Sequence, residues 1–155
     1  MRWRLIISIL FIGIVAFAIE SCEENGCGKT LLSSYDSHES EKMTGDCMNC
    51  HSPNGGAGSC FRIGGTAYDS ILSDSSVQNS IVKIYSQPNG AGELITTMQV
   101  DRSGNFYTTS PVSFGSGLYP AIISGTGHIR YMPQSTVTGA CNSCHGVTYP
   151  KIWAD

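Results

Sequence analysis

The chain has 155 residues, with 9 Lys and Arg against 12 Asp and Glu, which gives a formal net charge of −3. A chain of this length has room for one domain. A mildly acidic sequence without a basic stripe excludes a nucleic-acid partner. The composition also includes 7 cysteines, an unusually large number for a chain of this size.

Residues 1–21 are predicted to be a signal peptide. Two arginines follow Met1, and the run from Leu5 to Ile19 is apolar apart from Ser8 and Gly13. A membrane-spanning helix needs about 20 apolar residues, so this run is short for a span and typical of a secretory signal. An uncleaved anchor helix is the alternative.

The end of this segment, Ile19-Glu20-Ser21-Cys22, resembles the lipobox of bacterial lipoproteins. The aliphatic Ile19 and the small Ser21 fit that pattern, whereas Glu20 departs from it. The resemblance implies that Cys22 is lipidated and becomes the new N-terminus. A lipid anchor would hold the protein on a membrane without spanning it. The expected location is therefore the periplasm, outer membrane or cell surface of a bacterium.

Two five-residue motifs share one spacing, Cys47-Met48-Asn49-Cys50-His51 and Cys141-Asn142-Ser143-Cys144-His145. Two cysteines separated by two residues, with a histidine directly after the second, are typical of c-type haem attachment. The thiols bond to the vinyl groups of haem, and the imidazole binds the iron as proximal ligand. A shuffled chain of this composition would hold about 0.01 such motifs. The sequence therefore predicts two covalent haem c groups, with His51 and His145 as iron ligands and with four attachment residues: Cys47, Cys50, Cys141 and Cys144.

Two other chemistries use CxxC pairs. Zinc ribbons usually place their two pairs about 15–20 residues apart, whereas about ninety residues intervene here. Zinc also gives no reason for a histidine after both pairs. A redox-active CxxC is expected in a thioredoxin-like βαβ setting, which the sequence lacks.

The two remaining histidines are candidates for the sixth iron ligands. His38 and His128 each lie upstream of one motif, so the 4 histidines match two bis-histidine irons. Nearness in sequence assigns His38 to the first haem and His128 to the second. The alternatives are solvated surface histidines and, at the second iron, the thioether of Met132, which would raise the reduction potential.

Cys27 and Cys60 are left over from these assignments. In an oxidising compartment two leftover thiols most simply form a disulfide, which would tie the N-terminal tether to the segment after the first haem. Two free thiols are the alternative.

From residue 61 to about residue 123 the pattern is that of short strands separated by turns rich in Gly, Asn and Pro. Strands are expected at 61–68, 80–85, 93–100, 105–109 and 118–123. Met98 and Phe106 are expected to pack in the core, and Pro120 favours an edge position for the last strand. Helical periodicity is absent. The predicted fold class is mainly β, a small antiparallel β-sandwich flanked by two irregular haem-binding segments.

Several pieces of this region resemble the carboxypeptidase regulatory-like, or transthyretin-like, β-sandwich family. They are Gly65-Thr66-Ala67-Tyr68-Asp69, residues 81–85, residues 96–107 with their D-x-x-G-x-F hairpin at 101–106, and Gly117-Leu118-Tyr119. The resemblance covers about sixty residues. It implies a scaffold and carries no catalytic residues across.

The expected organisation is a signal peptide (1–21), a tether with the first haem segment (22–60), a β-sandwich (61–126) and a second haem segment (127–155). In the last segment, Tyr149 and Trp153 are expected either to lie against the second haem or to face solvent. No catalytic triad or carboxylate pair stands out, so the protein is not expected to be an enzyme.

The predicted function is electron transfer by a secreted, lipid-anchored dihaem c-type cytochrome. The expected partners are other redox proteins or cytochromes, with self-association through exposed haems. The alternative is a non-enzymatic haem-bearing β-sandwich that serves as an interaction or sensor module at the cell surface.

Overall fold

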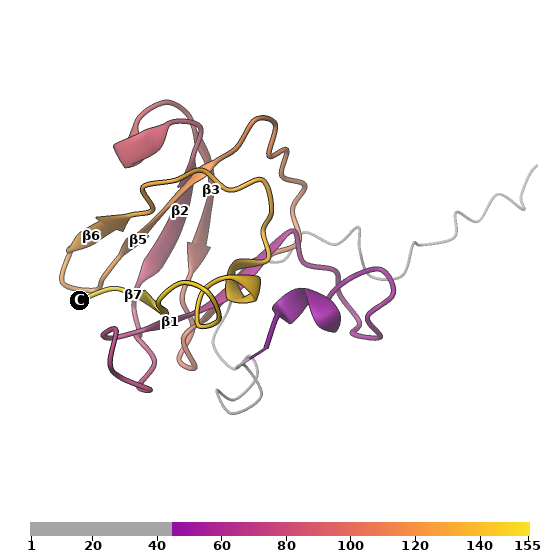
Figure 1. Cartoon of the computed structure of the whole chain (residues 1–155), viewed down its shortest axis with the longest axis horizontal. Helices are drawn as coiled ribbons and strands as arrows, with labels where there is room; N and C mark the ends of the chain where they lie inside the picture. The colour runs from indigo at the N-terminus through magenta and orange to yellow at the C-terminus, as the bar shows by residue number, and fades with distance from the viewer. Residues whose placement is uncertain (1–44) are drawn as a thin grey trace, which may run out of the picture.

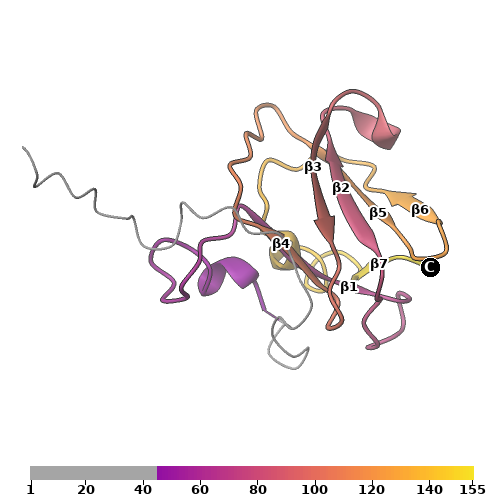
Figure 2. The same ribbon diagram turned by 180° about the vertical axis from the view of Figure 1, so that it is seen from behind.

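The computed structural model describes residues 45–155, and the strands in this range form two sheets (Figures 1 and 2). The strands are β1 (Ile63–Tyr68), β2 (Ile81–Tyr85), β3 (Leu94–Gln99), β4 (Asn105–Thr108), β5 (Tyr119–Ile123), β6 (Ile129–Tyr131) and β7 (Ile152–Trp153). Three short 3₁₀ turns accompany them, η3 (Cys47–Asn49), η4 (Pro88–Gly90) and η5 (Cys141–Ser143). None of the helical segments in the described range has the length and apolarity to cross a membrane.

One sheet has three strands in the order β4-β1-β7, and the other has four in the order β3-β2-β5-β6. All pairs are antiparallel except β1 with β7, which is parallel. The prediction of a mainly β chain that forms a small sandwich is confirmed.

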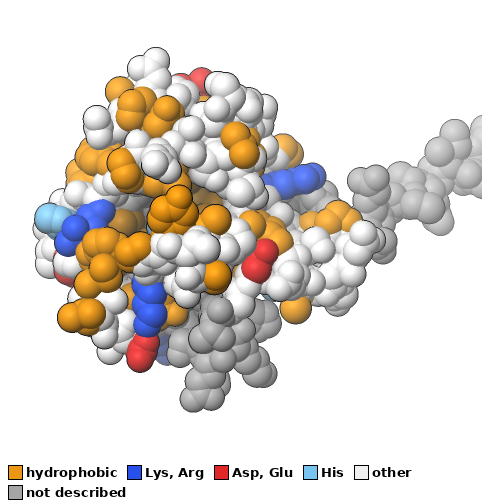
Figure 3. All heavy atoms as spheres, viewed as in Figure 1, with side chains coloured by type: hydrophobic (Ala, Val, Ile, Leu, Met, Phe, Trp, Pro, Cys, Tyr) orange, Lys and Arg blue, Asp and Glu red, His pale blue; other side chains and the backbone are white. Residues whose placement is uncertain are grey.

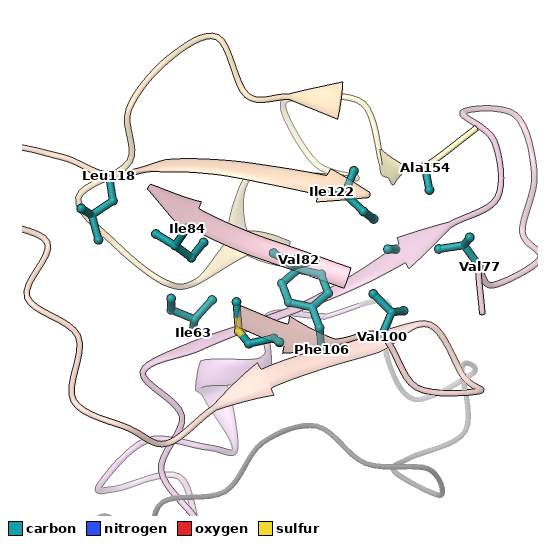
Figure 4. Packing of buried hydrophobic residues seen from close by; sticks show 11 residues of the cluster. Ile63, Val77, Val82, Ile84, Val100, Phe106, Leu118, Ile122 and Ala154 are labelled. Atoms are coloured by element: carbon teal, nitrogen blue, oxygen red, sulfur yellow. The ribbon is translucent and has the colours of Figure 1, made fainter. Parts of the chain in front are cut away.

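The core lies between the two sheets, where alternate residues of each strand point inward (Figure 4). In β2 the buried residues are Val82 and Ile84, and the residues on either side of them are only half-buried. They face Ile63 and Phe106 of the other sheet across the core (Figure 4). Met98 is fully buried, so the expected core positions of Met98 and Phe106 are confirmed. Burial of each such side chain contributes about 1.5–3 kcal/mol.

The edge position expected for the strand with Pro120 is wrong. β5 lies inside its sheet, between β2 and β6, and Pro120 is opposite Ile84 of β2. The N–H and C=O of one residue in a strand point to the same side. The Pro120 carbonyl accepts the N–H of Met132 at 2.9 Å, so the missing N–H also faces that side, just beyond the end of β6. Proline therefore removes no hydrogen bond to β2.

Two strands come from the segment expected to be an irregular haem-binding tail. β6 pairs with β5, and β7 pairs with β1 at Ala67 and Tyr68. The last residue, Asp155, still donates its N–H to the Asp69 carbonyl at 3.1 Å. Trp153 lies in β7, with the Arg130 guanidinium 5.0 Å from its ring. The sandwich therefore extends past residue 126 to the C-terminal end of the sequence.

Candidate functional site

Both CxxCH motifs fold into the same single turn. In each, the carbonyl of the first cysteine accepts the N–H of the second cysteine and of the histidine. The distances are 3.3 and 2.9 Å at Cys47, and 3.3 and 3.0 Å at Cys141. One helical turn brings residues three and four apart to the same side. The two thiols and the imidazole of each motif are thereby grouped as haem attachment requires.

Each motif histidine is held through the same ring nitrogen. Nδ1 of His51 donates to the Ser59 carbonyl at 3.0 Å, and Nδ1 of His145 donates to the Pro150 carbonyl at 2.7 Å. A proton on Nδ1 leaves the lone pair on Nε2. Iron- and zinc-binding histidines are oriented in this way, because the carbonyl fixes both the tautomer and the ring. The histidines therefore fit the predicted role of axial ligands.

Two aromatic rings stack in a row on the first histidine. The Phe61 ring stacks on His51 with 3.8 Å between ring centroids and 6° between ring planes. Tyr107 of β4 stacks on the other side of Phe61, at 4.3 Å and 10°. This stack restricts rotation of the imidazole, so it would fix the orientation of the ligand plane at an iron.

The second histidine lies in a more open setting. The Tyr149 ring centroid is 6.2 Å from that of His145 and tilted by 46°. Tyr149 and Val147 are 55% and 70% exposed. Hydrophobic side chains are gathered on the face that carries η5, β6 and β7 (Figure 3). Exposed apolar side chains beside the motif fit a site that receives the flat, apolar surface of a haem.

Two adjacent glycines of β1 leave room for the two turns to pack against the strand. A Cβ atom on Gly64 would lie 3.2 Å from Cys47 Cβ, and one on Gly65 would lie 2.8 Å from Cys141 Cβ and 2.6 Å from the Phe106 ring. Glycine inside a strand is typical of a close approach by another chain segment. Consecutive residues of a strand point to opposite faces. Cys141 therefore lies on the core face of β1, and Cys47 lies on the other face.

The side chain of Asn142, inside the second motif, joins the two turns. Its Oδ1 accepts the Thr66 N–H at 3.0 Å, and its Nδ2 donates to Thr66 Oγ1 at 3.1 Å. The same Nδ2 lies 3.3 Å from the Gly45 carbonyl and 3.8 Å from the Cys47 sulfur. The turns are thus neighbours although about ninety residues separate them, as η3 and η5 in Figure 1 show.

The predicted second haem segment also completes the edge of β1. Gly64 donates its N–H to the Gly139 carbonyl at 2.9 Å, and Thr66 donates its own to Asn142. β7 pairs with the next two residues of the strand. A Cβ atom on Gly139 would collide with the backbone of Arg62 and Ile63. Only glycine fits at position 139, and the edge of β1 is fully bonded.

Because the two CxxC pairs are neighbours in the structure, their wide separation in the sequence no longer argues against a shared zinc ion. The four sulfurs nevertheless do not converge, because Cys47 and Cys141 lie on opposite faces of β1, and Cys50 and Cys144 are exposed. Between residues 45 and 155 no three Cys, His, Asp or Glu side chains are grouped to hold a metal ion. The arrangement fits two separate attachment sites better than one tetrahedral site.

Burial raises the pKa of the two inner thiols, Cys47 and Cys141. It raises the pKa of Cys47 to about 11, with the Asp46 carboxylate adding to the rise. It raises the pKa of Cys141 to about 12, with Cys47 as the next contribution. A thioether sulfur carries no charge, so these partly buried positions suit thioether bonds without the cost of burying a charge.

The structure does not bring the candidate sixth ligands of the second iron to His145. His128 is exposed in the β5–β6 turn, where its N–H bonds Ser124 Oγ at 3.1 Å. This turn lies beside the C-terminus and apart from η5 in both views (Figures 1 and 2). Met132 continues the β5–β6 ladder through its bond to the Pro120 carbonyl. Either residue would have to leave the sheet to reach the second turn.

Of the other predicted positions, Cys60 is the one that lies within the described range. His38, Cys22 and Cys27 are outside the described residues. Cys60 is 3% exposed and disulfide-bonded, and its pairing with Cys27 stays a prediction.

Sequence reasoning missed the residues that join the two motifs, namely Gly64, Gly65, Gly139 and Asn142. The glycine pair carried a signal, because two adjacent glycines within a predicted strand indicate close approach of another segment. Asn142 carried none, since the attachment motif accepts any residue at that position.

Comparison with known proteins gives no further guide. No protein-family model, no curated protein sequence and no solved structure matches this chain.

Proposed function

We propose that this protein is an exported dihaem c-type cytochrome, anchored by a lipid on Cys22, that passes single electrons between redox partners. The observation that carries the proposal is the pair of identical turns. Each groups two thiols with a histidine, and each holds that histidine by Nδ1 to a backbone carbonyl. Haem, when bound, supplies a one-electron iron couple.

The chain's own groups would set the properties of that couple. The carbonyls of Ser59 and Pro150 hold the two imidazoles and increase their basicity as ligands. A more basic ligand favours ferric iron and lowers the potential. Phe61 fixes the plane of the His51 ring.

Exposure decides where electrons would enter and leave. Cys144 and the residues that follow His145 are on the surface, as is Cys50. A cofactor edge at the surface lets another redox protein, or a second copy of this chain, approach closely. The partners proposed are therefore other cytochromes or redox proteins.

The test combines a pyridine haemochrome spectrum with the intact mass of protein matured with the cytochrome c machinery. We expect two c-type haems that stay attached after denaturation, and an added lipid at a new N-terminal Cys22. Stopped-flow mixing with an oxidised cytochrome should then reoxidise the reduced protein rapidly. Zinc in place of haem, or haem that no partner oxidises, would contradict the proposal.

The sixth ligand of the second iron is tested separately with His128→Ala. Coordination by His128 requires one low-spin haem to become high-spin in this variant. Because the β5–β6 turn lies away from η5, we expect the absorption spectrum to be unchanged. A new high-spin band would show that His128 leaves its turn to bind the iron.

A further inference from the structure

The residue that joins the two turns is not required by the attachment chemistry. Asn142 is the second residue of its motif, a position at which haem attachment accepts any side chain. Its amide is nevertheless 7% exposed and engages three other residues, Thr66, Gly45 and Cys47. A buried amide with this many partners is difficult to replace, because each lost hydrogen bond leaves a buried polar group without a partner.

The two ends of this amide serve different parts of the molecule. Oδ1 binds the backbone of β1 through the Thr66 N–H, which docks the second turn on the sheet. Nδ2 reaches the Gly45 carbonyl and the Cys47 sulfur, both of which belong to the first turn or the residues that lead into it. Thr66 Oγ1 in turn donates to Asn105 Oδ1 at 3.1 Å, which ties the network to β4.

We infer that Asn142 is a positioning residue that holds the first attachment cysteine against the second attachment turn and thereby couples the redox behaviour of the two sites. The inference rests on the proposed function. Groups outside the ligand set tune a metal centre by fixing the geometry and the local dipoles around it, and Asn142 places an N–H dipole 3.8 Å from the sulfur of Cys47. Removal of the Asn142 amide should therefore alter the first haem, although the residue belongs to the second motif.

The test uses the full-length dihaem protein and two variants that change no charge. Asn142→Leu keeps the approximate volume and removes every hydrogen bond of the amide. Asn142→Ser keeps a small polar group that is too short to reach Gly45. The matched control is Asn49→Leu, the same substitution at an exposed position of the first motif. Potentials are measured by a redox titration followed by electron paramagnetic resonance, and are assigned with His145→Met, which raises the potential of the second haem only.

We expect Asn142→Leu to shift the potential and the resonance signal of both haems, Asn142→Ser to shift them less, and Asn49→Leu to affect the first haem alone. If Asn142→Leu does not fold, Asn142→Ser and Thr66→Val, which removes one partner of the network, give the same comparison. Shifts confined to the second haem would overturn the inference while leaving the proposed function intact. A protein that binds no haem would instead overturn the proposed function.

Discussion

The two attachment turns have the same backbone but are built into the molecule in different ways. The first begins at Asp46, whose carboxylate accepts the Met48 N–H at 3.0 Å, and continues into a loop that ends at the disulfide-bonded Cys60. The second begins at Gly139 and continues into β7, and both of these flanking segments pair with β1. The first turn is attached to one face of the sandwich, whereas the second is part of its sheet.

This difference separates what the motif determines from what its surroundings determine. The two motifs share their spacing and form the same turn hydrogen bonds although their flanking sequences differ. The position of each turn, the shielding of its histidine and its effect on stability come from other residues. Damage to the second site should therefore spread to the sandwich, and damage to the first should stay local.

The largest effect is expected from removal of one attachment pair. Cys141→Ala with Cys144→Ala, and Cys47→Ala with Cys50→Ala, should each leave one haem in place of two by mass spectrometry. Cys141 packs against the hydrophobic core, so the first of these variants should also melt at a lower temperature than the second. Equal melting temperatures would show that the second turn is no more integrated than the first.

A single methyl group should disturb the second turn nearly as much. Gly139→Ala places a Cβ atom into the backbone of Arg62 and Ile63, so the chain must move away from β1. We expect a loss of about 3 kcal/mol in the free energy of unfolding, the upper end for overpacking, measured by denaturant titration.

The control for this variant is Gly45→Ala beside the first turn. A Cβ atom there would meet nothing within 4 Å, so stability should be nearly unchanged. A similar loss in both variants would contradict the view that only the second turn is built into the sheet.

A smaller effect is expected from the aromatic residues beside the histidines. Phe61→Leu removes the stack on His51, worth about 1 kcal/mol, and should shift the potential of the first haem. Tyr149→Leu should change the second haem less, because that ring is tilted and its centroid is 6.2 Å from that of His145. Protein-film voltammetry of the two variants measures both potentials. A larger shift in potential from Tyr149→Leu than from Phe61→Leu would show that the second histidine, and not the first, is the more shielded one.

The smallest effect concerns the ion pair between Lys151 and Asp74, which lies on the surface near the second site. The Lys151 ammonium holds the pKa of the Asp74 carboxyl below its usual 3.8. The pair therefore stabilises the fold above that value and is lost as the pH falls through the lowered pKa. Asp74→Asn should leave the melting temperature unchanged at about pH 7, because exposed pairs contribute little. Below about pH 4 the melting temperature of this variant should fall slightly less than that of the unmodified protein, because the variant has no ion pair to lose. A clear loss at neutral pH would mean that the pair supports β7.

The sequence contained enough signal for the long strands and for the two groups of two thiols and a histidine, but not for the way these parts meet. Alternation predicted β1 to β5, because each has at least four residues. β6 and β7 have three and two residues, which is too short for a period to be recognised. The spacing within each motif singled out its thiols and histidine. The packing of both motifs against β1 depends on contacts between residues about ninety positions apart in the sequence. Such contacts are set by the packing of the whole sandwich.

The parallel pairing of β7 with β1 implies an order of events during biosynthesis. β1 precedes β7 by more than eighty residues, so this part of its second edge stays open until the residues of β7 have been synthesised. Docking of residues 139–142 on the same edge places Cys141 against the core, where burial raises the pKa of its thiol and lowers its reactivity. A maturation enzyme would therefore have to act on the second motif while the C-terminal segment is still undocked.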